Sequence, residues 1–337
     1  MNGGVEIAAV VYRGKMIEAI HYASVAVVNE RGELTHYLGD PDFTTMTRSC
    51  IKPFQLRPLV ESGAADHFGF DNRQLAIMCG SHNGTDLHRE AVMSNLSLAG
   101  NEPEHLLCGA HWPIGMEATR KFPQGGEEVD PVRHNCSGKH SGFLALARFL
   151  KENPDQYLNP QSETQKRVLS AVAGFCEYPV AKKDIGVDGC SAPNFPLSLR
   201  AVAHGFVKLA TEQAVSDDGR VVTRRIKQSM LEHPEMVSGQ GRFDLQLSNA
   251  YPGRLICKVG AEAIEGIALD DPPVGIAVKI HDGNWRALWP VCVEVLRQLG
   301  YNAVHESELR AFVRPEVRNV RNLVTGHIVP EFELHKV

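Results

Sequence analysis

The chain has 337 residues, a hydrophobic content of 43% and a formal net charge of -5 at pH 7. These values exclude a disordered chain and give no reason to expect nucleic acid or a membrane as partner. No apolar run approaches the ~18 residues needed to span a bilayer, and no secretory signal is visible. The eight cysteines are scattered, so we expect reduced thiols in a cytoplasmic protein.

Strand patterns open the chain, helical patterns occupy its middle, and strand patterns return at its end. Strands are expected at 5–12, 17–28, 34–38, 185–187, 254–259, 262–269, 274–281 and about 322–329. Helices are expected from Ser49 to about 62 with a kink at Pro58, and at 73–78, 85–99, 138–151, 163–176, 197–211, 220–233 and 285–298, the last interrupted by Pro290. Residues 100–135 and 235–243 are expected to be connections.

This order predicts an α+β fold. Strands from the two ends of a chain pair most simply into one antiparallel sheet, with the helical middle inserted as a second layer. We therefore expect one two-layer catalytic unit over residues 1–337, in which 1–46 and 254–337 form the sheet region and 47–253 the mainly helical region. Ser49 would then lie at the border between sheet and helices.

The segment around Ser49 carries the chemistry. Ser49 and Lys52 lie three residues apart at a predicted helix start, so they share one helical face. A serine hydroxyl becomes a nucleophile when a base takes its proton, and a neutral buried lysine is such a base. Lowering the pKa of a lysine from about 10.4 to 7–8 requires about 4 kcal/mol, which burial or a neighbouring cation supplies. Alone, Ser-x-x-Lys is more often a capped surface helix with a solvated lysine.

Two further elements support the chemical interpretation. Ser81-His82-Asn83 has the form Ser-x-Asn, and Lys258-Val259-Gly260 has the form Lys-x-Gly. In this order the three elements are typical of serine β-lactamases and penicillin-binding proteins. Lys258 is the cation expected to lower the pKa of Lys52, and Ser81 is expected to relay a proton to the leaving group. A helix-cap hydroxyl is the alternative for Ser81.

These motifs and several others resemble the rhizobial-type, or class 3, L-asparaginases, whose fold is like that of serine β-lactamases. The resemblance runs along nearly the whole chain. The matching segments are Tyr12-Arg13-Gly14 to His21, Arg48 to Gln55, Cys79 to Gly84, Asn135 to Gly142, Asp188-Gly189-Cys190, Met236 to Gly239 and Lys258 to Glu262. The family pattern continues with glycine after the Ala261-Glu262 pair, where this chain has Ala263.

The resemblance implies hydrolysis of the L-asparagine side-chain amide to L-aspartate and ammonia, with two Ser–Lys pairs: Ser49 with Lys52, and Ser81 with Lys258. It also implies a homodimer without an organic cofactor, and one zinc ion per chain. The implied zinc ligands are Cys136, Lys139 and Cys190. Their spacing alone does not predict a metal site, because buried free cysteines are common.

Four residues beside the motifs are expected to bind the substrate: Arg48, Asn83, His140 and Asp188. An arginine suits the α-carboxylate and an aspartate the α-ammonium, while a local salt bridge or cap is the alternative for each. Other functions remain open at this point. A glutaminase or a β-lactam-type serine hydrolase would use the same chemistry. A non-enzymatic protein that binds zinc or an amino acid could also share the fold.

Overall fold

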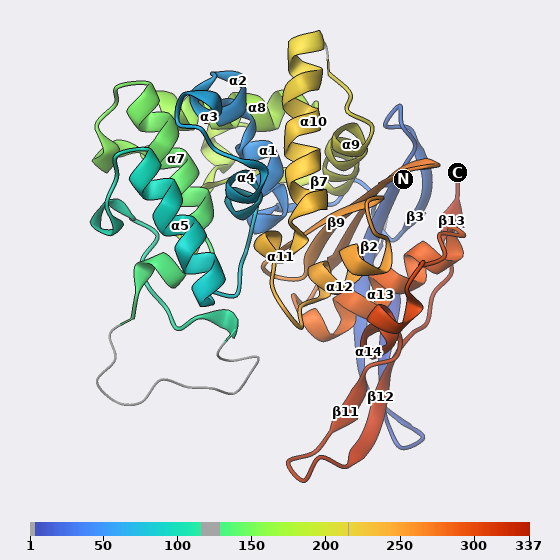
Figure 1. The fold of residues 1–337 in the computed structure, drawn as a ribbon. Helices are drawn as coiled ribbons and strands as arrows, with labels where there is room; N and C mark the ends of the chain where they lie inside the picture. Colours follow the sequence, from blue (N-terminus) through green and yellow to red (C-terminus); the bar gives the residue numbers. More distant parts are fainter. Residues whose placement is uncertain (1–3, 116–128, 215) are drawn as a thin grey trace. The chain divides into compact units, whose positions relative to one another are not determined.

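The computed structural model describes residues 4–115, 129–214 and 216–337 (Figure 1). The chain divides into two compact units, which are named here by their content. The sheet unit comprises Met1–Cys50, Leu197–Thr211 and Gln246–Val337, and the helical unit comprises Ile51–Pro196 and Glu212–Leu245.

The sheet unit is built on one antiparallel sheet. In the described part of the chain it has nine strands, in the order β11-β12-β1-β2-β10-β9-β8, while β3 pairs with β2 and β13 with β3. The strands of this sheet are β1 (Glu6–Arg13), β2 (Met16–Val28), β3 (Leu34–Leu38), β8 (Leu255–Gly260), β9 (Ile264–Asp270), β10 (Pro273–Ile280), β11 (Glu316–Arg318), β12 (Val324–Pro330) and β13 (His335–Lys336).

The two ends of the chain meet in this sheet, as the sequence predicts. β1 pairs with β12 so that Val10 lies opposite Val329, and β2 pairs with β10 so that Val25 lies opposite Val278. Both pairs are antiparallel. The expected mixture of helix and antiparallel sheet is therefore confirmed, while the likeness to serine β-lactamases stays a prediction.

Two helices cover opposite faces of the sheet, α9 (Leu199–Ala210) and α13 (Trp285–Gln298). A Cβ at Gly266 would lie 2.1 Å from the ring of Phe206, so the missing side chain lets α9 approach β9 closely. On β2, His21 lies on the face of the sheet opposite α9, and there it accepts a hydrogen bond from Arg286 of α13 at 2.9 Å. Side chains alternate between the faces of a strand, so the two helices enclose the sheet.

The remaining elements of the sheet unit are short connections. They are β4 (Thr44–Met46), η1 (Arg48–Ile51), β7 (Pro196–Ser198), α12 (Phe243–Ala250), η6 (Glu306–Leu309) and α14 (Arg310–Val313). The boundary between the units falls within η1 and α12, and Pro196 of β7 belongs to the helical unit.

The helical unit is a bundle of short helices. These are α1 (Lys52–Gln55), α2 (Arg57–Glu61), α3 (Ala64–His67), α4 (Asn72–Met78), α5 (Asp86–Leu98), α7 (Ser137–Phe149), α8 (Glu163–Phe175), α10 (Asp217–Glu232) and α11 (Pro234–Val237). Between them lie η2 (Pro103–His105), η3 (Pro131–Arg133), η4 (Pro154–Gln156), η5 (Lys182–Asp184), β5 (Gly186–Val187) and β6 (Pro193–Asn194).

Helix α7 is the centre of the helical unit and packs on α4 and α5. Its residues 137–147 are all buried. A Cβ at Gly138 would lie 2.2 Å from the carbonyl oxygen of Ile77, so glycine is required where α4 meets the start of α7. This close packing fixes the helix end on which Lys139 stands.

Several element boundaries differ from the sequence prediction. The single helix expected from Ser49 is divided into η1, α1 and α2, because Pro58 has no N–H to donate to the carbonyl of Phe54. Conversely, α13 continues through Pro290, since its buried side packs on the sheet and offsets one missing hydrogen bond. Of the predicted connection at 100–135, residues 116–128 lie outside the described part.

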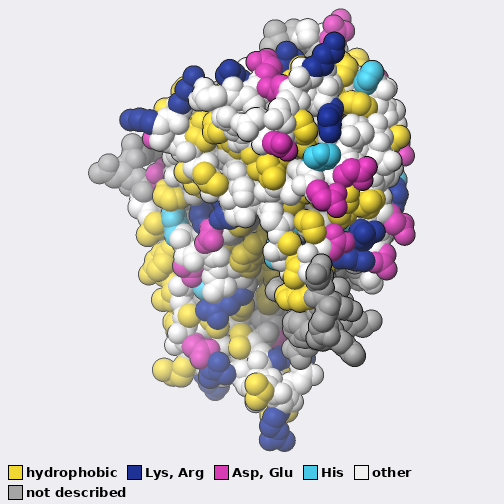
Figure 2. All heavy atoms as spheres, turned by 90° about the vertical axis from the view of Figure 1, so that its left-hand side faces the viewer, with side chains coloured by type: hydrophobic (Ala, Val, Ile, Leu, Met, Phe, Trp, Pro, Cys, Tyr) yellow, Lys and Arg dark blue, Asp and Glu magenta, His cyan; other side chains and the backbone are white. Residues whose placement is uncertain are grey.

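The surface agrees with the modest net charge. On the face shown in Figure 2, basic and acidic side chains are interspersed among the described residues, with no extended area of one sign. None of the helices in residues 4–115, 129–214 and 216–337 has the length and apolar character required to cross a membrane.

Candidate active site

Ser49 lies in η1, at the end of the sheet unit's first segment. Its side chain is 9% exposed, and the preceding Arg48 adopts a left-handed backbone with φ 50°. A non-glycine residue in this region is uncommon and is found preferentially at functional turns. The guanidinium of Arg48 lies 3.8 Å from the carboxylate of Glu262 and remains partly exposed.

Lys258 stands on β8, which passes beside the turn that carries Ser49. A Cβ at Gly260, two residues further along the strand, would lie 2.7 Å from the carbonyl oxygen of Thr47 and 3.0 Å from the backbone nitrogen of Cys50. Lys258 is fully buried, and its Nζ donates to the carbonyl of Val259 at 2.6 Å. The sheet unit therefore holds the strand of Lys258 against the segment of Ser49.

Lys52 contacts Ser81 in the helical unit. Lys52 begins α1 and is fully buried, and its Nζ donates to the hydroxyl oxygen of Ser81 at 2.9 Å and to the carbonyl of Gly80. The sequence predicted Lys258, not Lys52, as the partner of Ser81. The predicted pairs Ser49–Lys52 and Ser81–Lys258 each join residues of different units, and they stay predictions.

The segment Ser81-His82-Asn83 is extended, with two side chains on one side and one on the other. The N–H groups of Ser81 and Asn83 donate to the carbonyls of Val237 and Ser238, at 2.8 and 3.0 Å. The N–H of His82 donates to the carbonyl of Asn135 at 3.2 Å. In an extended segment alternate side chains share a face, so Asn83 lies on the side of Ser81.

His82 anchors this segment to the start of α7. Its Nε2 lies 3.1 Å from the hydroxyl of Ser137, which itself donates to the carbonyl of Val132, and its Nδ1 accepts from the N–H of Gly84. His82 Nε2 is therefore the donor. Burial, with the nearby His88 and Lys52, holds the pKa of His82 well below its ordinary value. The ring is neutral and acts as a fixed connection.

Two predicted substrate residues carry buried polar atoms that have no hydrogen-bond partner in the described chain. Asn83 donates through Nδ2 to the carbonyl of Gln240 at 3.1 Å, whereas its Oδ1 is unpartnered. His140 is paired through Nδ1 with the hydroxyl of Tyr157 at 2.7 Å, whereas its Nε2 is unpartnered. Such atoms cost stability unless a ligand pairs with them, which favours a binding role for both residues.

The residues expected to bind zinc are brought together in the helical unit. The amine of Lys139 donates to the sulfur of Cys190 at 3.1 Å, and the thiols of Cys136 and Cys190 are hydrogen-bonded. The Asp188 carboxylate lies 3.7 Å from the same sulfur. All three expected ligands are buried.

Hydrogen bonding between the two thiols moves their pKa values apart. The hydrogen bond from Cys190 lowers the pKa of Cys136, while the same bond and burial raise the pKa of Cys190. Burial alone would lower the pKa of Lys139, but Cys190, Cys136 and Asp188 raise it above its ordinary value.

This donor set fits zinc, because two thiolates suit the ion and a deprotonated amine supplies a third ligand. In residues 4–115, 129–214 and 216–337, no group of three or more His, Cys, Asp or Glu side chains is placed to hold a metal. A zinc site at Cys136 and Cys190 therefore depends on Lys139.

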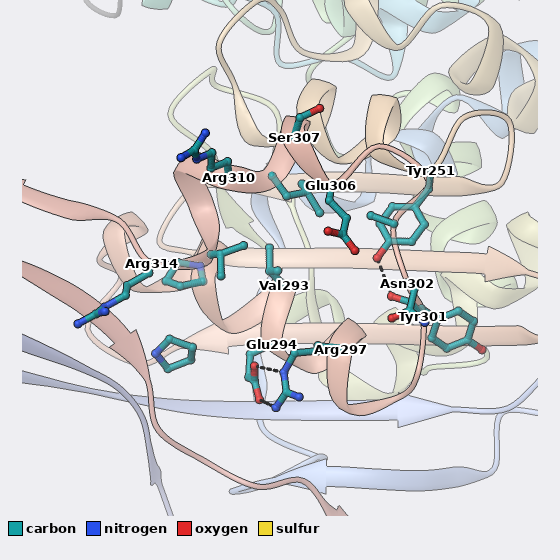
Figure 3. Close-up of a pocket in the computed structure, with 15 residues that line it drawn as sticks. Tyr251, Val293, Glu294, Arg297, Tyr301, Asn302, Glu306, Ser307, Arg310 and Arg314 are labelled. Carbon is teal, nitrogen blue, oxygen red and sulfur yellow. Dashed lines mark hydrogen bonds and ion pairs between the residues drawn. The ribbon is translucent and has the colours of Figure 1, made fainter.

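A separate cavity of about 610 Å³ lies in the sheet unit between α13, η6 and α14 (Figure 3). Glu294 and Arg297 form a two-fold ion pair on its wall, and Tyr251 donates to the carbonyl of Tyr301. None of the predicted site residues lines this cavity. Its polar side chains offer no serine–lysine pair, so the hydrolytic chemistry is not placed there.

Sequence reasoning missed the residues that support the site. Tyr157 and Ser137 orient His140 and His82, and Ser238 lies beside Asn83. For Ser238 a signal existed, because Met236 to Gly239 is one of the segments that carry the family resemblance. Ser238 and Asn83 are far apart in the sequence, so their proximity could not be predicted from it.

Comparisons with known proteins give the family of the chain. The family model described as L-asparaginase II matches residues 9–330. A comparison with curated proteins gave no match. Among solved structures, Mglu in its native form is similar over 88% of this chain and 69% of its own, at 15% identity and a TM-score of 0.48. A Bacillus glutaminase is similar over 83% and 91%, at 13% identity and a TM-score of 0.38. At these scores the structural likenesses carry no conclusion about this chain.

Proposed function

The chain belongs to the L-asparaginase II family, which supports an amidohydrolase, and from this premise we propose that it hydrolyses the side-chain amide of L-asparagine to L-aspartate and ammonia. The observation that carries the proposal is the buried contact between Lys52 and Ser81. Lys52 follows Ser49 by three residues in the sequence. We further propose a fold like that of serine β-lactamases. We also propose a homodimer, and light scattering of the purified protein tests this oligomeric state.

In the proposed reaction Ser49 is the nucleophile. Lys52, when neutral, takes the proton of the Ser49 hydroxyl while the oxygen attacks the amide carbon. The backbone N–H of Ser49 is proposed as one donor to the oxyanion that forms. The carbon–nitrogen bond then breaks and leaves a β-aspartyl ester on Ser49.

Ser81 delivers the proton that the leaving nitrogen needs. Its hydroxyl lies 2.9 Å from the Lys52 amine, so Ser81 can give its own proton to the leaving nitrogen while it takes one from the Lys52 ammonium. Ammonia departs, and a water molecule hydrolyses the ester with Lys52 again as base. Lys258 is proposed as the positive charge that favours neutral Lys52, and its replacement by an uncharged residue should lower the rate.

The substrate is proposed to bind through its charged head group. Arg48 suits the α-carboxylate and Asp188 the α-ammonium, while the unpartnered Asn83 Oδ1 and His140 Nε2 pair with polar groups of the substrate. Zinc is proposed to bind Cys136, Lys139 and Cys190. When bound, the ion would fix these side chains and orient the neighbouring Asp188.

Ammonia release from L-asparagine, L-glutamine and a chromogenic β-lactam tests the substrate. We expect release from asparagine at the highest kcat/KM. Mass spectrometry of protein quenched during turnover tests the mechanism, with the β-aspartyl adduct expected on the peptide that contains Ser49. An adduct on Ser81 would make Lys52–Ser81 the nucleophilic pair and would overturn the assignment of roles.

A further inference from the structure

A third buried polar atom without a partner lies on a residue to which no role has yet been assigned. Ser238 is 1% exposed, and its hydroxyl oxygen has no hydrogen-bond partner within the described chain, like Asn83 Oδ1 and His140 Nε2. A buried hydroxyl without a partner destabilises a folded protein. Its presence therefore needs an explanation outside the free protein.

The backbone places Ser238 directly beside Asn83. The carbonyl of Ser238 accepts the N–H of Asn83 at 3.0 Å, and the carbonyl of Gln240 accepts the Asn83 side-chain amide at 3.1 Å. Between them, a Cβ at Gly239 would lie 2.5 Å from Asn83 Cγ. The chain from 238 to 240 is thus wrapped closely around Asn83.

The position separates this pair from other unpartnered atoms of the helical unit. Gln55, Asn95, His140 and Gln165 also carry an unpartnered buried polar atom, and these four residues stand within helices α1, α5, α7 and α8. Ser238 and Asn83 instead stand in two non-helical segments, and one of these continues from Ser81. The backbone of Ser81, whose hydroxyl accepts from Lys52, is hydrogen-bonded to the carbonyl of Val237, and that of Asn83 to the carbonyl of Ser238, so the two segments run side by side.

The chemistry of the two atoms indicates what they bind. Asn83 Oδ1 is only an acceptor, and the Ser238 oxygen can accept and donate. An ammonium group offers three donors and no acceptor, so it satisfies both oxygens at once. The Ser238 O–H can then donate to the carboxylate that is attached, like the ammonium group, to the α-carbon of the substrate.

We propose that Ser238 is a specificity-determining residue that binds, together with Asn83 and in addition to the Asp188 carboxylate proposed above, the α-ammonium group of an α-amino-acid amide substrate, whose three N–H donors suit three acceptors. This inference rests on the proposed amide hydrolysis and adds the group by which the substrate is selected. A site built to bind a polar group strongly rejects the analogue that lacks it, because the polar atoms of the site are then left unpaired.

Succinamate is the matched probe, since it is asparagine without the α-ammonium group. In Ser238→Ala we expect kcat/KM for asparagine to fall about 10- to 100-fold, the effect of one hydrogen bond to a charged group, while kcat/KM for succinamate stays within about twofold. Ser229→Ala is the control, because Ser229 is a buried serine of the same unit whose hydroxyl donates to the carbonyl of Ile226. It should preserve the ratio of the two substrates.

Thermal unfolding gives a readout that does not depend on turnover. The Tm of Ser238→Ala should equal or exceed that of the wild type, because no hydrogen bond within the protein is lost, whereas Ser229→Ala should lower it. L-aspartate should raise the Tm of the wild type more than succinate does, and Ser238→Ala should remove this difference.

The outcomes separate the two levels of inference. Equal losses on asparagine and succinamate, no loss on either, or a fall in Tm as large as that of Ser229→Ala would each overturn the role of Ser238. A wild-type protein that releases no ammonia from asparagine would overturn the proposed function. The aspartate and succinate shifts would then still decide whether Ser238 binds an ammonium group.

Discussion

Replacement of Gly239 by alanine should disable the proposed site by displacing Asn83. Gly239 has φ 148°, a conformation that L side chains rarely adopt, and a Cβ there would lie 2.5, 2.6 and 2.9 Å from three atoms of Asn83. Carbon atoms in contact prefer about 3.5–4.0 Å, so the Asn83 side chain must move by about 1 Å. This movement breaks its 3.1 Å hydrogen bond to the carbonyl of Gln240.

The expected magnitude follows from these terms. The backbone conformation costs about 1–3 kcal/mol, the overlap about 1–3 kcal/mol and the lost hydrogen bond about 1 kcal/mol. We therefore expect Gly239→Ala to lower the free energy of unfolding by about 3–7 kcal/mol. Displacement of a substrate-binding group by about 1 Å should also lower kcat/KM for asparagine about 100-fold.

Gly241→Ala is the matched control in the same segment. Gly241 has φ 79°, and nothing lies within 4 Å of a Cβ placed there, so the replacement costs only the left-handed backbone, about 1–2 kcal/mol. Thermal unfolding and asparagine kinetics of both variants measure the difference. If Gly239→Ala matched Gly241→Ala in stability and in kcat/KM, the close approach to Asn83 would not matter for the site.

Four further predictions concern the chemistry and the backbone. Ser49→Ala should lower kcat about 10⁴- to 10⁶-fold, and the Ser49→Ala/Lys52→Ala double variant little more; additive losses would show that the two residues do not act as a unit. Activity should rise with pH along one limb between roughly pH 7 and 9, because the lysine base must lose its proton, and Lys258→Met should move that limb upward; a flat profile would exclude a lysine base. Cys190→Ala should abolish tight zinc binding in elemental analysis while lowering kcat far less than Ser49→Ala, and acid should weaken zinc binding in the wild type, because the thiols and the amine must be deprotonated. Ala263→Gly should raise the free energy of unfolding by up to about 1 kcal/mol, because Ala263 has φ 53°; an unchanged denaturation midpoint would show that the turn tolerates alanine.

The sequence predicted the sheet well because its signals are local and repeat along the chain. The runs of Val and Ala in β2 and of Ile and Val in β10 predict strands, and their pairing follows from the order of the elements. A kink at Pro58 was predicted in the first helix, but its division into η1, α1 and α2 was not, because the length of each piece depends on how α1 and α2 pack on α8. Pro290 shows the opposite case, in which packing maintains a helix that the local rule would interrupt.

From the sequence, only residues within or beside the recognised motifs could be predicted as site residues. Cys136, Lys139 and Cys190 lie close together in the structure although their spacing alone does not predict a metal site, and the zinc ion that the resemblance implies stays a prediction. The contact between Lys52 and Ser81 could not be predicted, because either lysine of the motif set can serve as partner of Ser81. The role of Ser238 could not be predicted for another reason. Whether a buried polar atom has a hydrogen-bond partner depends on its surroundings, which only the structure shows.

The alternation of side chains explains why the middle residue of Ser81-His82-Asn83 matters although it takes no part in the proposed reaction. Ser81 and Asn83 face the side where Lys52 donates, whereas His82 points away and donates to Ser137. Ser137 stands between Cys136 and Lys139 at the start of α7. A neutral histidine therefore connects the segment that carries the proposed chemistry to the segment that carries the proposed zinc ligands. Because the His82 ring is buried and uncharged, this connection should persist across the pH range in which the lysine base titrates.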